Sequence, residues 1–209
     1  MIYLPIGMKS ETTAQLGRPR TFDTDVALDR AMHVFWAKGY EGASLSDLTR
    51  AMRVNRPSLY AAFGNKEQLF RKVLDRYMNG PLAYFGKALG AAKARDVIEQ
   101  IFFGVADMAG DPRVPAGCLV VQGALACGDA AGSVRKEIAA LRAAAKAALR
   151  RRLQRAKLEG DLPKNADPGE LSHYVMTVLH GMAVQGADGA SCDQLRSVAQ
   201  IALRAWPKH

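Results

Sequence analysis

Apolar side chains recur along this chain at the three- and four-residue intervals that place them on one face of a helix, and the two-residue alternation typical of strands is missing. Residues 25–38 give the first example, with a stripe made of Ala27, Ala31, Val34 and Phe35. Asp23 or Thr24 can cap this helix at its N-terminus, and Gly39 is expected to end it. The pattern predicts an all-α protein.

Two shorter helices follow, and each has its own start signal. Ser44 and Asp47 resemble a capping box in front of the second helix. Asn55 can cap the third helix, whose first turn contains Pro57, where the absent N–H costs little, and Gly64 is expected to end it. One apolar stripe can hold the two helices together, namely Leu45, Leu48, Val54, Leu59 and Phe63. Two short helices joined by a tight turn are typical of a helix-turn-helix, which places its second helix in the major groove of DNA.

The remaining chain continues the helical pattern. Asn65, with Gln68 three residues later, is expected to cap a fourth helix. Beyond it the chain is rich in alanine, and glycine and proline clusters separate six further helices, expected near residues 81–90, 95–109, 116–127, 134–158, 168–187 and 191–205. The predicted domains are a flexible basic arm over 1–20, a three-helix DNA-binding domain over 21–67 and a second helical domain over 68–209.

Charge and cysteine content narrow the class of partner. The formal net charge of +9 favours an anionic partner, and nucleic acid is preferred to a membrane because the basic residues are spread along the chain. No apolar run approaches the roughly 20 residues of a membrane span, so no membrane partner is expected. Three cysteines without a CxxC pair favour a reducing cytoplasm. The opening lacks the basic start of a signal peptide, and Met8 is an alternative to Met1 as the first residue.

The run GASLSDLTRAMRVNRPSLYAAFGNKEQLF resembles the helix-turn-helix signature of the TetR/AcrR family of bacterial transcriptional regulators. The resemblance spans Gly42 to Phe70 almost without interruption and includes Leu59-Tyr60 and Lys66-Glu67. It implies a regulator, more often a repressor than an activator, that binds a palindromic operator in double-stranded DNA as a homodimer. It also implies that a small-molecule effector, bound in the second helical domain, releases the protein from its operator.

The same resemblance implies roles for individual side chains. Phosphate contacts are implied for Ser44, Tyr60 and Lys66, and contacts with bases for Arg56, Pro57 and Ser58. The chemistry agrees, because an arginine can donate two hydrogen bonds to a guanine edge, a serine can bond to any base, and a helix N-terminus attracts phosphate. For Tyr60 the alternative is packing in the core, which its polar neighbours disfavour.

Two positions depart from the family pattern, and one motif precedes it. Arg53 occupies the turn between the two helices, where the family usually has glycine and the backbone often needs a positive φ. Ala61 replaces a usually larger polar residue, so that base reading is expected to be weaker or to use a thymine methyl group. Arg18 and Arg20 lie on an extended stem that could reach an A·T-rich minor groove, or could be a basic linker.

The second domain is expected to hold the effector in a mostly apolar pocket. Candidate lining residues are Phe85, Phe102, Phe103, Met108, Cys118, Gln122, Met176 and His180, and the alternative for each is ordinary core packing. The last two helices are expected to pair with those of a second copy, since Gly181, Ala183 and Ala187 permit close helix approach.

Other functions fit the residues less well. Cys118 could make the protein a redox- or electrophile-sensing regulator, although a buried inert thiol is favoured. His173 and His180 share a helix face but have no third ligand nearby, so no metal and no cofactor are expected. An enzyme is not expected, because no nucleophile elbow, phosphate loop or zinc motif occurs. A non-specific architectural DNA binder would not need the long second domain.

Overall fold

The structure is a computed structural model that describes residues 22–124, 128 and 131–207. The described part contains helices and no strands, so the predicted all-α class is confirmed. In chain order the helices are α1 (Thr24–Gly42), α2 (Leu45–Met52), α3 (Arg56–Phe63), α4 (Lys66–Asn79), α5 (Ala83–Ala88), α6 (Ala94–Ala109), α7 (Leu119–Gln122), α8 (Gly132–Leu158), α9 (Pro168–Ala187) and α10 (Cys192–Arg204). Among these residues, no helix combines the length and apolar character needed to cross a membrane.

The first four helices begin where the predicted caps place them. Asp23, rather than Thr24, caps α1 by accepting hydrogen bonds from the backbone N–H groups of the first turn. Complete capping boxes precede α2, at Ser44 with Asp47, and α4, at Asn65 with Gln68. These side chains satisfy N–H groups that have no partner within the helix, which explains why the local sequence fixes the helix starts.

Gly39 was expected to end the first helix, but α1 continues to Gly42 across a kink at this residue. Gly39 has φ 69° and ψ 177°, and a Cβ added there would lie 3.3 Å from the carbonyl oxygen of Gly123. The next residue, Tyr40, donates its backbone N–H to that same oxygen at 2.8 Å. Glycine is therefore needed because the α7 segment approaches the backbone closely, and the last turn then resumes.

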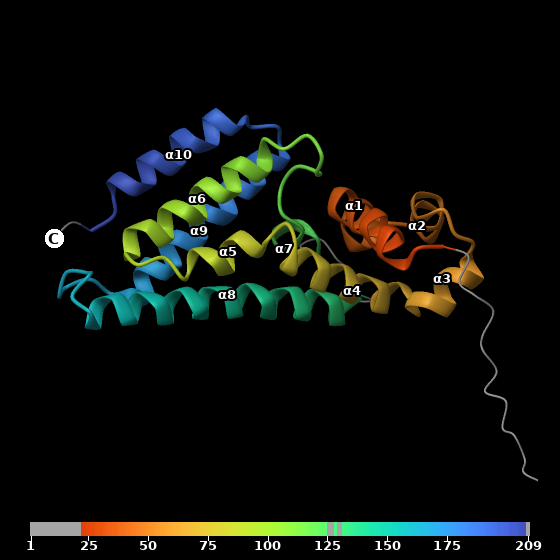
Figure 1. The fold of residues 1–209 in the computed structure, drawn as a ribbon, viewed down its shortest axis with the longest axis horizontal. Coiled ribbons are helices and arrows are strands. Elements are labelled where there is room, and N and C mark those ends of the chain that lie inside the picture. Colours follow the sequence, from red (N-terminus) through yellow and green to blue (C-terminus); the bar gives the residue numbers. More distant parts are fainter. Residues whose placement is uncertain (1–21, 125–127, 129–130, 208–209) are drawn as a thin grey trace, which may run out of the picture.

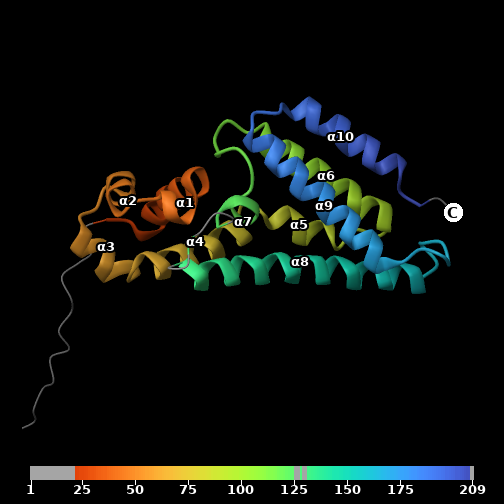
Figure 2. The same ribbon diagram turned by 180° about the vertical axis from the view of Figure 1, so that it is seen from behind.

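The helices of the second half form a layered bundle beside the first three (Figure 1). α8, with 27 residues, runs along one side of α5 and α9, while α10 covers α6 on the other side (Figure 2). α4 leads from the helix-turn-helix into this bundle and approaches the start of α8. The second half is thus a bundle of long helices into which two short ones, α5 and α7, are inserted.

The helix predicted near 116–127 is wrong in extent, since among the described residues of this span, 116–124, only Leu119–Gln122 is helical. Gly117 has φ 84° and Cys118 is extended, with φ −134° and ψ 122°, so the chain enters this region without helical geometry. Gly123 follows the single turn directly. The apolar run GCLVV is buried by its contacts with other helices, and such burial gives no signal of a regular helix in the sequence.

One continuous core joins the two halves. The Trp36 and Tyr77 rings pack edge to face, with centroids 4.8 Å apart, and both side chains are fully buried. The Trp36 indole N–H donates to the carbonyl oxygen of Gly117 at 3.2 Å. The junction between the helix-turn-helix and the bundle is therefore packed and hydrogen-bonded.

Candidate nucleic-acid interface and ligand cavity

The turn between α2 and α3 has the positive φ that was expected at the position of Arg53. Arg53 lies in the left-handed region, with φ 57° and ψ 44°, and is the one residue other than glycine with a positive φ in the described part of the chain. Its backbone N–H donates to the carbonyl oxygen of Arg50, and the N–H of Val54 donates to that of Thr49. The expectation that Arg53 has the backbone conformation of a glycine is confirmed, and this conformation carries a free-energy cost of about 1 kcal/mol.

α3 has one buried and one exposed face. Leu59 and Phe63 are buried beneath it, while the exposed face consists of Arg56, Pro57, Tyr60 and Ala61. Tyr60 is 46% exposed, a high value for an aromatic side chain, and therefore lies outside the core. Ser58 is only half-buried, and its backbone N–H donates to the Asn55 side chain at 2.8 Å. The structure thus brings three of the four predicted α3 residues onto one solvent-facing surface and leaves Ser58 at its edge.

Ser44, a predicted phosphate contact, is exposed but already engaged. Its hydroxyl donates to Asp47 Oδ2 at 2.8 Å and accepts from the Asp47 backbone N–H at 3.0 Å. Lys38 reaches the same carboxylate oxygen at 3.0 Å. The hydrogen bond from Lys38, followed by those from Ser44, lowers the pKa of Asp47 to about 2. A phosphate bound by the Ser44 hydroxyl must therefore compete with Asp47.

Ser46 contacts a predicted DNA-binding residue, Arg56, and the sequence reasoning did not identify it. It is exposed on α2, and its hydroxyl oxygen accepts a hydrogen bond from Arg56 Nη2 at 3.3 Å. This contact orients the Arg56 guanidinium from the neighbouring helix. Its position on the polar side of α2 was the available signal, but only the turn geometry shows that it reaches Arg56.

The remaining predicted DNA contacts belong neither to α2 nor to α3. Lys66 is the first residue of α4, and its Nζ lies 4.6 Å from the centre of the Tyr40 ring. The Lys66 side chain is half-buried against Tyr40, while Asn65, the N-cap residue of α4 beside it, is exposed. Arg18 and Arg20 lie outside the described residues.

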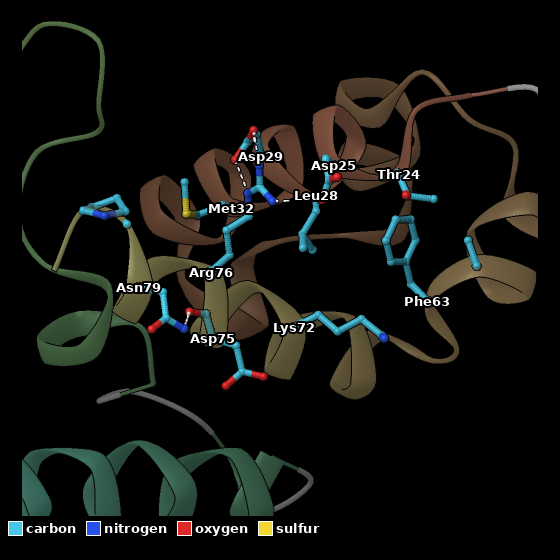
Figure 3. A pocket seen from close by; sticks show the side chains of 13 residues that line it. Thr24, Asp25, Leu28, Asp29, Met32, Phe63, Lys72, Asp75, Arg76 and Asn79 are labelled. Atoms are coloured by element: carbon cyan, nitrogen blue, oxygen red, sulfur yellow. Dashed lines mark hydrogen bonds and ion pairs between the residues drawn. The ribbon is translucent and has the colours of Figure 1, made fainter. Parts of the chain in front are cut away.

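A groove of about 720 Å³ lies between α1 and α4, and an ion-pair cluster crosses it (Figure 3). Arg76 of α4 binds both carboxylate oxygens of Asp29 on α1, with Nη2 and Oδ2 2.8 Å apart, and its Nη1 lies 3.0 Å from Asp25. A guanidinium that binds one carboxylate through two nitrogens fixes orientation as well as distance. The cluster therefore sets the position of α1 on α4.

A second cavity, also of about 720 Å³, lies inside the bundle between α4, α5, α8 and α9. Four of the eight predicted pocket residues line it, namely Phe85, Cys118, Met176 and His180. The other four do not: Phe102 is fully buried in the core, the Phe103 ring lies beneath Arg196, Met108 packs against the core, and Gln122 donates to the Ala116 carbonyl. Aromatic and sulfur-containing residues thus divide between cavity wall and core.

The sequence reasoning missed the wall that α8 contributes. Ala144, Ala145 and Ala148 face the cavity at helical spacing, and Leu141, Arg142 and Arg151 continue the same wall. These alanines leave space where larger side chains would fill it. The alanine-rich composition of this segment was visible in the sequence, but it was interpreted only as a helix signal.

Two ionisable groups at the cavity have shifted pKa values. Burial raises the pKa of the Cys118 thiol, and the Tyr77 hydroxyl donates to its sulfur at 3.3 Å. Burial, with a smaller contribution from the charge of Arg142, lowers the pKa of His180. His173 is exposed on the same helix, and no group of three His, Cys, Asp or Glu residues with metal-binding geometry occurs among the described residues. Cys127 lies outside them.

The short segment around α7 connects this cavity to α1. Its inner side contributes Cys118, Val120 and Val121 to the cavity wall. On its outer side, the carbonyls of Gly117 and Gly123 accept hydrogen bonds from the Trp36 side chain and the Tyr40 backbone, at 3.2 and 2.8 Å. This cavity-lining segment is therefore joined to α1 by hydrogen bonds. The end of α4 also lines the cavity, and α4 contacts α1 through Arg76.

α9 and α10 each carry exposed apolar side chains, namely Val184 at 41%, Val198 at 43% and Ile201 at 63% exposure. Gly181 of α9 is also exposed, with open space where a Cβ would be. Ala183, which was expected to permit helix approach, is buried and lines the cavity, whereas Ala187 is exposed.

Comparison with known proteins covers both halves of the chain. Residues 27–73 match the family profile described as bacterial regulatory proteins, tetR family, and residues 94–188 match that of the tetracyclin repressor-like C-terminal domain. The chain is similar to the HTH-type transcriptional repressor ComR of Escherichia coli, with 33% identity over 92% of each chain. It is also similar to the repressor BdcR of the same organism, with 28% identity over 90% of this chain and 91% of the other.

Solved structures show the same architecture. A cysteine mutant of the TetR family regulator CifR, in complex with 26-base-pair double-strand operator DNA, has 43% sequence identity and a TM-score of 0.87. The match covers 91% of this chain and 100% of that one. A TetR transcriptional regulator from Rhodococcus sp. RHA1 has 36% identity and a TM-score of 0.61, over 88% of this chain and 100% of its own.

Proposed function

Because this chain belongs to the TetR family of bacterial regulatory proteins, we propose that it is a homodimeric repressor whose α3 helices read an operator and whose bundle cavity binds the releasing effector. The observation that carries the DNA-binding part is the exposed face of α3, where Arg56, Pro57 and Tyr60 project together while Leu59 and Phe63 anchor the helix. Related repressors of similar length, and a regulator bound to operator DNA, support the same assignment.

The proposed contacts follow from where each group lies. Arg56 is assigned to a guanine edge, braced by Ser46, and Pro57, Ser58 and Ala61 to neighbouring bases. Tyr60, Lys66 and Ser44 are assigned to phosphates, with Ser44 sharing its hydroxyl between Asp47 and the DNA. Arg18 and Arg20, which lie outside the described residues, are assigned to the adjacent minor groove from the sequence alone.

We assign the dimer contact to the outer face of α9 and α10. Val184, Val198 and Ile201 leave apolar surface exposed on these two helices, and Gly181 permits close approach. A two-fold axis there would carry two copies of α3 to successive major grooves, about 34 Å apart. Residues 21–67 are then the DNA-binding domain and 68–209 the effector and dimerisation domain, and a protein that acts on the chromosome works in the cytoplasm.

The effector is assigned to the cavity between α4, α5, α8 and α9, which has the size of small-molecule sites. A ligand there touches Met78 and Asn79 at the end of α4, and Val120 and Val121 of the α7 segment. Both segments contact α1. Arg76 of α4 binds Asp29 of α1, and two carbonyls of the α7 segment accept hydrogen bonds from Trp36 and Tyr40 of α1. Thiol sensing by Cys118 is disfavoured because burial raises its pKa, which keeps the thiol protonated and weakly nucleophilic.

The test is selection of bound duplexes from a random DNA pool by the full-length protein, followed by titration of the selected sequence at two salt concentrations. A palindrome with half-sites one helical turn apart, bound by one dimer, is the expected result. Binding without sequence enrichment would contradict the assignment of α3 as a reading helix, and enrichment of a single half-site would contradict the dimer.

A further inference from the structure

The bundle cavity has an unusual charge pattern. Among the described residues that line it, Lys87, Arg142, Arg151 and His180 are basic, and none is an aspartate or a glutamate. Most of the other lining residues are apolar. Cys118 and Tyr84 also line the cavity, but burial raises the pKa of each and keeps both groups uncharged. The charged side chains of the wall are therefore all cationic, which favours an anionic ligand over a neutral or cationic one.

Two of the basic groups, Arg142 and Arg151, lie at opposite ends of the α8 wall. Arg142 lies near His180, because both also border a small surface groove with Val121 and Gly181. Arg151 lies nine residues further along α8, or about 14 Å at the helical rise per residue, and Ala144, Ala145 and Ala148 leave room between the two arginines. Arg151 and Lys87 are exposed, whereas Arg142 and His180 are half-buried. Along α8, the cavity wall therefore has the exposed Arg151 at one end and the half-buried Arg142, near His180, at the other.

Arg142 has unused capacity to bind an anion. Its Nη1 donates to the carbonyl oxygens of Val120 and Val121, at 2.8 and 3.4 Å, and within the described chain its Nε and Nη2 donate to no acceptor. No carboxylate of the described residues forms an ion pair with it, unlike Arg71, Arg76 and Arg113. A half-buried guanidinium without a counter-ion gains free energy when an anionic group binds to its free N–H groups.

We propose that the effector is an apolar molecule with one anionic group, a carboxylate or a similar oxyanion, which binds Arg142 beside His180 while its apolar part lies along the alanines of α8. The proposal rests on the assignment of this cavity as the effector site. Arg142 is then the residue that determines ligand class, and the exposed Lys87 and Arg151 attract the anion to the cavity.

Two fluorescent dyes test the charge requirement directly. 1-Anilinonaphthalene-8-sulfonate and N-phenyl-1-naphthylamine share their ring system, and only the first carries an anionic group. The full-length protein is expected to bind the sulfonate on the order of tenfold more tightly, as for one charge-assisted hydrogen-bonded pair. Arg142→Gln is expected to abolish that preference and to leave the affinity for the neutral dye unchanged. Arg135→Gln is the matched control, because Arg135 is exposed on the same helix, does not line the cavity and makes no ion pair with the described residues.

A measurement without any variant covers the case in which Arg142→Gln fails to fold. Decanoate and 1-decanol have the same chain length and differ in charge, and each can displace the neutral dye from the wild-type protein. Decanoate is expected to displace it at a concentration on the order of tenfold lower. Equal displacement by the acid and the alcohol would overturn the charge requirement.

Ala145→Trp, which fills the cavity, distinguishes a failure of this inference from a failure of the proposed function. If it eliminates binding of both dyes and the wild-type protein binds them equally, the cavity is the ligand site but its preference for anions is disproved. If Ala145→Trp still binds both dyes, or if the wild-type protein binds neither, then the assignment of the cavity as the effector site and its preference for anions are both disproved. A sulfonate preference that survives in Arg142→Gln would show that Arg142 does not determine ligand class.

Discussion

The helix-turn-helix and the effector cavity are built on different principles. In α2 and α3, each helix start is fixed by a residue within three positions of it, as with Ser44 and Asp47 or Asn55 and Ser58. The cavity instead takes its walls from α4, α5, α8 and α9, helices that are up to about 100 residues apart in the chain. The first region is specified locally and its core is filled, whereas the second is specified by distant packing and is hollow.

This difference implies different responses to mutation. A filled local unit loses stability when a core side chain is shortened, because the neighbours cannot close the gap. A hollow region tolerates the same change, and ligand binding is more sensitive there than folding. Matched substitutions in the two regions should therefore differ in how much stability and how much binding they cost.

Leu59→Ala and Leu179→Ala compare the two interiors directly. Leu59 is fully buried under α3, so its truncation is expected to lower the free energy of unfolding by about 2–5 kcal/mol. Leu179 borders the existing cavity and should lose about 2 kcal/mol or less, because part of its surface has no protein neighbour. Urea unfolding followed by circular dichroism, at equal protein concentration, measures both. Equal losses of stability would mean that the bundle around the cavity is as tightly packed as the helix-turn-helix.

Arg56→Ala and Lys66→Ala compare base reading with backbone binding within the DNA-binding unit. Loss of the Arg56 guanidinium is expected to cost about 1–3 kcal/mol against the selected operator and to relax preference at one base pair. Loss of Lys66 should weaken binding to every duplex alike and reduce the dependence of log affinity on log salt concentration by about one. Titration of matched and single-mismatch duplexes at two salt concentrations separates the two. If Arg56→Ala weakened all duplexes equally, Arg56 would be a phosphate ligand.

How far the sequence specifies each region follows from the same contrast. The caps at Ser44, Asn55 and Asn65 were predictable because each depends on neighbouring residues alone. The backbone geometry at Arg53 was predictable from the resemblance to a family that usually has glycine there. Phe85 and Phe102 were equally good candidates for the cavity, yet one lines it and the other is buried in the core. Whether a helix face lines a cavity or packs in the core depends on the residues of the facing helices. The periodicity of one helix does not identify those residues.

The turn at Arg53 is a local feature that carries a local cost. Arg53→Gly is expected to raise the free energy of unfolding by about 1 kcal/mol or less, because glycine adopts φ 57° without the steric penalty of a side chain. Arg50→Gly is the matched control, since Arg50 is helical and exposed and should lose about 1 kcal/mol. Thermal unfolding of the two variants should therefore shift in opposite directions. A loss of stability in Arg53→Gly would mean that the arginine side chain contributes more than its backbone conformation costs.

The smallest effect concerns the capping box of α2 and is visible only in acid. Asp47 has a pKa of about 2 in the folded protein against 3.8 for a free carboxyl, because the charged form is stabilised by Lys38 and Ser44. A group whose pKa is lowered by folding adds stability that is complete above pH 3.8 and is lost as the pH falls through 2. Asp47→Asn should therefore be less stable than the wild type near neutral pH, and the difference should shrink between pH 4 and pH 2. Asp75→Asn, on an exposed carboxylate with no ion pair to the described residues, should show no such convergence. A stability difference between wild type and Asp47→Asn that stayed constant from pH 7 down to pH 2 would show that the charge on residue 47 adds nothing to the start of α2.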